Sequence, residues 1–122
     1  MRFAKFVFYG AGIYGLLALV PQYFLEAKNG RDFPPAITHP EYFYGFVGVG
    51  VAFQVVFLII GRDPRRYRAM MIPSMIEKFS FVIAVYALFA LDRVALAMVG
   101  AASIDLLLGI LFAISFFRTR EE

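Results

Sequence analysis

The chain contains no cysteine and no tryptophan, and it has a single histidine, His39. The absence of cysteine excludes disulfides, thiolate metal ligands and cysteine nucleophiles. His39 and the nearby Glu41 provide only two metal ligands, which is too few for a zinc site. We therefore expect no bound metal, and we interpret these two residues as part of a helix start at the membrane interface.

Motifs that hold nucleotides or nucleophiles are also missing. The sequence has no phosphate-binding loop, no dinucleotide fingerprint and no nucleophile triad, so we expect no cofactor. Charged residues are scarce, at 17% of the chain. The net charge is +3, but the basic residues flank apolar segments, as topology signals in membrane proteins do. We therefore expect no nucleic-acid partner.

Apolar side chains are in excess instead. They make up 61% of the 122 residues, whereas a soluble domain is roughly 45–50% apolar. The excess falls in four segments, about 6–25, 41–60, 70–91 and 94–117, each long enough to cross a bilayer as a helix. Residues 1–122 are therefore predicted to form one all-α domain, an integral membrane four-helix bundle with up-down topology.

The basic residues predict the orientation of this bundle. Three of them, Lys28, Arg31 and Arg93, belong to the end opposite the termini, and Lys78 lies within a span. The end that carries both termini has eight: Arg2, Lys5, Arg62, Arg65, Arg66, Arg68, Arg118 and Arg120. Since the side of a membrane protein that is richer in Lys and Arg is the cytoplasmic one, both termini are predicted to be cytoplasmic.

The connecting segments carry helix-start signals. Residues 26–40 are predicted to form the longest loop. At its end, Thr38 and Glu41 match a capping box, with Thr38 as the N-cap of the second span. In the next loop, Asp63 and Pro64 match an N-cap and a first helical residue, which predicts that the third helix begins at Pro64.

Polar side chains interrupt the apolar segments at one depth. Glu77 and Lys78 stand side by side in the third span, and Asp105 lies in the middle of the fourth on a ridge of small residues. When the spans are aligned by their connections at about 1.5 Å per residue, residues from all four spans reach a similar level in the inner half of the bundle. The predicted ligand-binding residues are Tyr14, Gln54, Glu77, Lys78, Ser80 and Asp105.

Two interpretations of this polar layer are open. A charged side chain at mid-membrane costs about 2.5–3.5 kcal/mol on insertion scales, so these groups are expected to face the protein interior. They form either a site for a ligand or a proton, or a buried ion-pair network that fixes helix register. Both interpretations predict that Asp105 faces Glu77 or Lys78 across the hairpin of the third and fourth spans.

The layout resembles a known family. Four short spans, cytoplasmic termini and an acidic residue in the fourth span within Asp105-Leu-Leu-Leu-Gly109 look like the DoxX-like group of small bacterial membrane proteins. Thr38-His-Pro-Glu-Tyr-Phe-Tyr44 and Gly61-Arg-Asp-Pro-Arg65 also resemble segments of uncharacterised bacterial membrane proteins. The resemblance implies a bacterial plasma (inner) membrane location and a role as a small subunit of quinone-linked oxidoreductase systems. It transfers no catalytic residue.

Three functions remain open from the sequence. The first is an accessory or structural subunit of a larger membrane complex, in contact with lipids and with other membrane protein subunits or copies of itself. The second is a binder or carrier of a small apolar, lipid-like or quinone-like molecule, held at its polar end by Glu77, Lys78 and Asp105. The third is an enzyme such as an intramembrane isomerase, which would use the carboxylates as acid and base, or a proton-coupled transporter.

Overall fold

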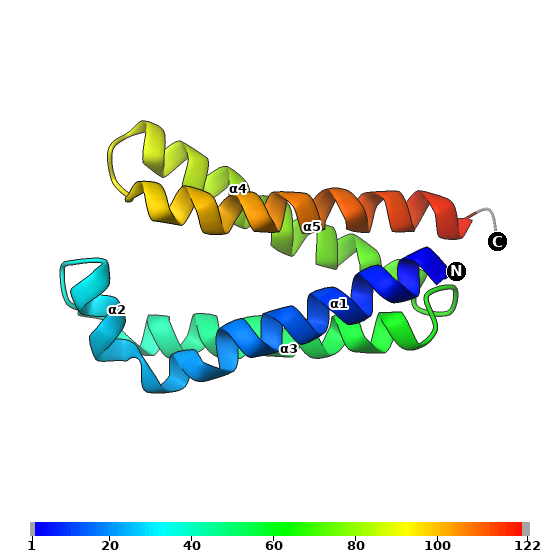
Figure 1. The fold of residues 1–122 in the computed structure, drawn as a ribbon, viewed down its shortest axis with the longest axis horizontal. Coiled ribbons are helices and arrows are strands. Elements are labelled where there is room, and N and C mark those ends of the chain that lie inside the picture. The colour runs from blue at the N-terminus through cyan, green and yellow to red at the C-terminus, as the bar shows by residue number, and fades with distance from the viewer. Residues whose placement is uncertain (1, 121–122) are drawn as a thin grey trace.

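The computed structural model describes residues 2–120, which are helical with no strand (Figure 1). Four helices are long and apolar enough to cross a membrane. They are α1 (Arg2–Leu19) with the 3-10 helix η1 (Val20–Phe24), α3 (Pro40–Arg62), α4 (Met71–Ala90) after the 3-10 helix η2 (Arg68–Met70), and α5 (Leu96–Arg120). These helices coincide with the four predicted apolar segments, and the predicted all-α class is confirmed.

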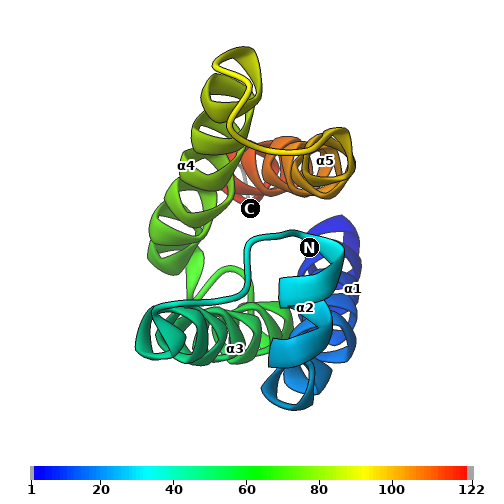
Figure 2. The same cartoon turned by 90° about the vertical axis from the view of Figure 1, so that its left-hand side faces the viewer.

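The four long helices form two antiparallel hairpins. One hairpin pairs α1 with α3, and the other pairs α4 with α5. The hairpins meet at the end of the molecule where α1 begins and α5 finishes, and they diverge toward the opposite end (Figures 1 and 2). The arrangement is therefore a V of two hairpins, an open form of the four-helix, up-down arrangement that the sequence predicts.

Aromatic packing closes the vertex of this V. The Phe8 ring of α1 stacks on the Phe112 ring of α5 with centroids 4.2 Å apart. The Phe57 ring of α3 meets Phe112 edge to face at 4.9 Å. Because α1, α3 and α5 each supply one ring, this contact joins the two hairpins. The buried core around it is Ala4, Val7, Phe8, Ala11, Phe57, Ile60, Met71 and Phe112.

The connection between the first two spans differs from the prediction. Part of the expected loop forms a short helix, α2 (Glu26–Asp32). Helix α3 begins at Pro40, His39 is its N-cap, and no side chain caps it, so the predicted capping box of Thr38 and Glu41 is wrong. Proline at the first helical position sets the start instead, because its fixed φ suits a helix and its missing N–H has no intrahelical partner there.

The start of the third long helix was also predicted wrongly. Asp63 ends α3, and its carboxylate Oδ1 accepts a hydrogen bond from the Arg66 backbone N–H at 3.3 Å. The chain then forms a turn and the 3-10 helix η2, and α4 begins at Met71 rather than at Pro64. A tertiary contact competes with the local signal, since Arg68 donates from Nε to the Phe116 carbonyl at 2.9 Å and stacks on the Phe116 ring.

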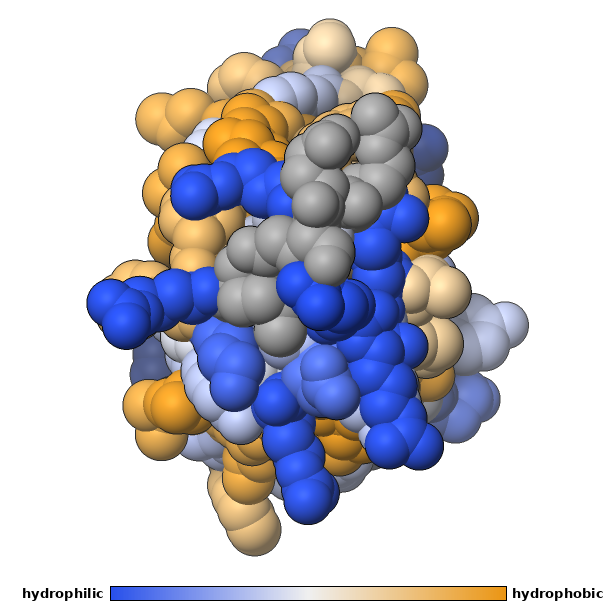
Figure 3. Space-filling model, turned by 90° about the vertical axis from the view of Figure 1, so that its right-hand side faces the viewer, coloured by the Kyte–Doolittle hydropathy of each residue, from blue (hydrophilic) through white to orange (hydrophobic). Residues whose placement is uncertain are grey.

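Hydrophilic side chains gather at the vertex end of the molecule, the face drawn in Figure 3. Three of its arginines lie against aromatic rings: Arg118 over Phe3 at 4.7 Å, Arg68 over Phe116 at 3.6 Å and Arg66 over Tyr67 at 5.4 Å. The exposed basic side chains that belong to this end are Arg2, Lys5, Arg62, Arg65, Arg66 and Arg118. One end of the molecule is thus strongly basic, while the long helices that lead away from it are apolar.

Candidate functional site

A cleft of about 510 Å³ lies between the two hairpins. Helices α1, α3, α4 and α5 all contribute to its lining. The lining includes every residue that the sequence singled out: Tyr14, Gln54, Glu77, Lys78, Ser80 and Asp105. The structure therefore brings the predicted polar layer together in one cavity, whereas its use as a binding site stays a prediction.

Lys78 is the centre of the charged part of this cleft. Its ammonium nitrogen Nζ lies 3.3 Å from Asp105 Oδ1 and 3.8 Å from Glu77 Oε1. Only 6% of the Lys78 side chain is exposed. On the side of the aromatic core, the same nitrogen lies 5.3 Å from the centroid of the Phe57 ring. The predicted facing of Asp105 and Lys78 across the α4–α5 hairpin is confirmed.

A glycine lets the α4–α5 hairpin close at this point. A Cβ atom added to Gly109 of α5 would lie 2.9 Å from the Phe79 ring and 3.3 Å from the Cβ of Lys78. Gly109 stands one helical turn from Asp105, so the close approach of the two helices brings the carboxylate within reach of Lys78. The small-residue ridge of the fourth span thus positions the ion pair.

Gln54 is the polar residue that α3 contributes to the cleft. The side chain is buried, and its amide Nε2 donates to the Gly50 carbonyl at 2.8 Å. The amide oxygen Oε1 lies against α1 at Gly15, where an added Cβ would be only 1.8 Å away. Within residues 2–120, this buried oxygen accepts no hydrogen bond. Gln54 therefore lines the same cleft as the charged residues without a described bond to any of them.

Tyr14 and Ser80 lie at more exposed positions of the cleft. The Ser80 hydroxyl donates to the Glu77 carbonyl at 3.2 Å, which is a bond within α4. The Tyr14 side chain is largely exposed on α1. Neither residue takes part in the ion pairs of Lys78. Within residues 2–120, no group of three or more His, Asp or Glu side chains is placed to hold a metal ion.

The sequence prediction missed the walls of the cleft. Most wall residues lie one or two helical turns from a polar residue of the same helix, on the side of the open end of the V. Helical periodicity, counted outward from each polar residue, would have predicted these wall residues. Phe46 of α3 and Phe81 of α4 face each other across the hairpins, with ring centroids 6.4 Å apart. The missed residues are Gly15, Ala18, Leu19, Phe46, Val49, Gly50, Phe81, Ala84 and Ala101.

The cleft thus has a polar floor, apolar walls and a closed inner end. Glu77, Lys78 and Asp105 form the floor, directly beyond the aromatic core that joins the hairpins. Comparisons with protein-family models, curated proteins and solved structures give no match. The resemblance to DoxX-like proteins therefore stays a prediction from the sequence, and the chemistry of the cleft must be argued from its own residues.

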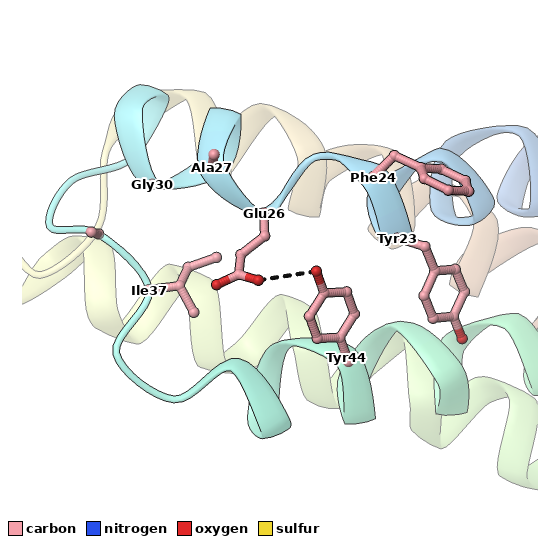
Figure 4. A pocket seen from close by; sticks show the side chains of 8 residues that line it. Tyr23, Phe24, Glu26, Ala27, Gly30, Ile37 and Tyr44 are labelled. Carbon is pink, nitrogen blue, oxygen red and sulfur yellow. Dashed lines mark hydrogen bonds between the residues drawn. The ribbon is translucent and has the colours of Figure 1, made fainter.

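A second hollow, of about 440 Å³, lies at the open end of the V between α2 and α3. Figure 4 shows Tyr44 of α3 pointing toward Glu26 of α2, with Ile37 beside the carboxylate. The Tyr44 hydroxyl donates to Glu26 Oε1 at 3.0 Å, and the Tyr44 ring stacks on Tyr23 with centroids 6.1 Å apart. These contacts hold α2 against the outer end of α3.

Replacing Tyr44 by Phe is expected to lower the free energy of unfolding by about 0.5–1.5 kcal/mol, the usual net contribution of one hydrogen bond. The ring contacts remain, so only the bond to Glu26 is lost. Thermal unfolding in a mild detergent measures the change. The matched control is Tyr42→Phe, which removes an exposed hydroxyl two residues away. Equal effects of the two substitutions would contradict the assigned role of the bond.

Proposed function

We propose that the chain is an integral membrane protein with the vertex of the V, and both termini, on the cytoplasmic side, in a bacterial plasma membrane. Four long apolar helices support the insertion. The gathering of basic side chains at the vertex end supports the orientation, because cytoplasmic ends of membrane proteins are rich in Lys and Arg. In this orientation, the cleft lies within the membrane and opens toward its outer half.

We further propose that this cleft binds a small amphipathic molecule. The single observation that carries the proposal is a cavity of about 510 Å³ with three charged side chains at one end and apolar or aromatic residues along the rest. Ligand pockets in proteins are typically about 300–1,000 Å³, apolar on most of their walls, with a few convergent polar groups. A buried ion-pair network alone requires no such empty volume around it.

The geometry also sets the direction in which the ligand lies. The aromatic core closes the cleft on the cytoplasmic side of Lys78, so a ligand cannot pass through the vertex without moving these rings. The polar end of the ligand therefore contacts the charged floor. Its apolar body extends along the apolar walls, past Phe46 and Phe81, toward the open end of the V, where it meets lipid chains.

A second candidate function, an accessory subunit of a larger membrane complex, is favoured by a different observation. Gly45 on α3 and Gly100 on α5 are exposed, and a Cβ added to either would meet no atom within 4 Å. Such uncovered glycines allow a helix of another subunit to approach the backbone closely. The two functions are separable, because ligand binding by the isolated chain requires no partner.

Filling the cleft is expected to abolish ligand binding. The probe is a photoreactive decanol that carries a diazirine on its chain, added to the protein in phosphatidylcholine nanodiscs. In the unmodified protein, we expect crosslinks at cleft residues such as Phe46 and Phe81, mapped by mass spectrometry. The substitution Ala101→Phe places a ring in the cavity and is expected to reduce these crosslinks about tenfold or more, since contacts in a filled pocket are lost.

The matched control for this test is Ala97→Phe. Ala97 is exposed on the same helix, one turn farther out, and it does not line the cleft. Its substitution adds the same ring and is expected to leave the crosslinks unchanged. If Ala101→Phe and Ala97→Phe behave alike, or if the crosslinks spread evenly over the lipid-facing surface, the cleft is not a binding site.

A further inference from the structure

We propose that the ligand of this cleft carries an ammonium group, so that it is an amine with an apolar chain rather than a quinone or an acid. The inference rests on the proposed function, because it concerns the same cavity. It depends on the charge balance of the floor and on which hydrogen-bonding atoms of the cleft have partners.

The charged side chains of the floor do not balance one another. Two carboxylates, those of Glu77 and Asp105, share one ammonium group, that of Lys78. Other charged residues do not appear in the lining of the cleft. When both acids are ionised, the floor therefore carries one excess negative charge. Unbalanced charge is costly inside a membrane protein, and a cation that enters the cleft removes this cost.

The unpartnered atoms point to the same kind of ligand. Glu77 Oε2 is buried and has no hydrogen-bond partner within residues 2–120, and the same holds for Gln54 Oε1. Both atoms are acceptors. A buried acceptor without a donor destabilises the folded state by about 1–3 kcal/mol. The carboxylate of Glu77, whose side chain is 24% exposed, is therefore expected to turn toward a ligand that brings N–H donors, as an ammonium group does.

Three donors of the cleft, in contrast, already have an acceptor. Lys78 directs its ammonium group at Asp105 and Glu77, and the Gln54 amide nitrogen donates to the Gly50 carbonyl. The Ser80 hydroxyl donates to the Glu77 carbonyl. A quinone, which only accepts hydrogen bonds, would leave both the excess negative charge of the floor and the free Glu77 acceptor without a partner. An acid would in addition place a third negative charge beside Glu77 and Asp105.

Competition against the photoreactive decanol tests the proposal. Decylamine, decanol, decanoate and a decyl-substituted benzoquinone are added to the protein in phosphatidylcholine nanodiscs at neutral pH, and the loss of crosslinks gives each apparent affinity. We expect decylamine to compete about tenfold better than decanol or more, the effect of one or two charge-assisted hydrogen bonds. Decanoate and the quinone are expected to compete no better than decanol.

Variants separate the cleft from the lipid. Partition into the bilayer is the same for every variant, so a change in the ratio of decylamine to decanol affinity reports the site itself. Glu77→Gln and Asp105→Asn each remove one carboxylate, and either is expected to reduce the ratio to about threefold or less. The matched control is Asp92→Asn in the exposed α4–α5 turn, which removes the same charge outside the cleft and should keep the wild-type ratio.

Each outcome decides a different claim. A wild-type preference for decylamine that falls in both cleft variants and persists in Asp92→Asn supports the proposal. Equal competition by decylamine and decanol overturns the ammonium inference, while the proposed amphiphile site stands. Crosslinks that none of the four compounds reduces overturn the amphiphile site together with the inference.

Discussion

Replacing Lys78 by Met is expected to lower the free energy of unfolding by about 3–5 kcal/mol, the cost of breaking a buried ion pair by removing one partner. Methionine keeps most of the apolar length of lysine but removes the ammonium group that lies 3.3 Å from Asp105 and 3.8 Å from Glu77. Two carboxylates are then left close together without a cation. Reversible unfolding in mixed detergent and denaturant micelles gives the change in free energy.

Two further variants show whether this loss comes from charge. Lys28 forms an ion pair with Asp32, but 57% of its side chain is exposed, so Lys28→Met is expected to change stability by less than about 1 kcal/mol. The double variant Lys78→Met with Asp105→Asn removes one charge of each sign and is expected to recover a large part of the lost stability. If the double variant is less stable than Lys78→Met alone, the charge explanation is wrong.

Replacing Gly15 by Ala is expected to destabilise the α1–α3 hairpin by about 1–3 kcal/mol, the usual cost of inserting a methyl group into a packed contact. The added Cβ would lie 1.8 Å from Gln54 Oε1, 2.3 Å from its Cδ and 2.7 Å from its Cγ. Because Nε2 is bonded to the Gly50 carbonyl, Gln54 can move only by breaking that bond. The same unfolding measurement applies.

Gly10 provides the matched control on the same helix. It is exposed, and a Cβ there would meet no atom within 4 Å, so Gly10→Ala is expected to leave stability unchanged or to raise it by up to about 1 kcal/mol through helix propensity. Adding Gln54→Ala to Gly15→Ala removes the clash and should restore most of the loss. If Gly15→Ala destabilises the protein equally in the presence of Gln54 and in the Gln54→Ala background, the clash with Gln54 is not the cause of the destabilisation.

Helix class and the depth of the polar groups could be predicted from the sequence because both follow from spacing along one helix. Glu77 and Asp105 lie at known distances from the short turn that joins α4 and α5, so a rise of about 1.5 Å per residue brings them to within about one helical turn of each other. The contact between Lys78 and Asp105 follows the same arithmetic. The same counting along each helix could have predicted wall residues such as Phe81 and Ala101, which the sequence prediction missed.

The starts of the helices could be predicted less well from the sequence. The signals there are only a few residues long, and they compete with contacts to residues far along the chain. Asp63 and Pro64 match a helix start, but the chain forms a turn and the 3-10 helix η2 before Met71, where Arg68 contacts Phe116 of α5 through one hydrogen bond and its ring. At α3, the capping pattern of Thr38 and Glu41 loses to Pro40, whose ring fixes the first helical residue.

The sequence by itself determined the four apolar helices, their up-down order and the level of the charged groups, because these depend on composition and on rise per residue. Only the tertiary structure decided that the helices form two diverging hairpins, that Phe8, Phe57 and Phe112 join them at one end, and that a cleft remains between them. The reason is that side-chain volume decides how closely two helices approach. The same spacing along the chain is compatible with a filled bundle or with an open V.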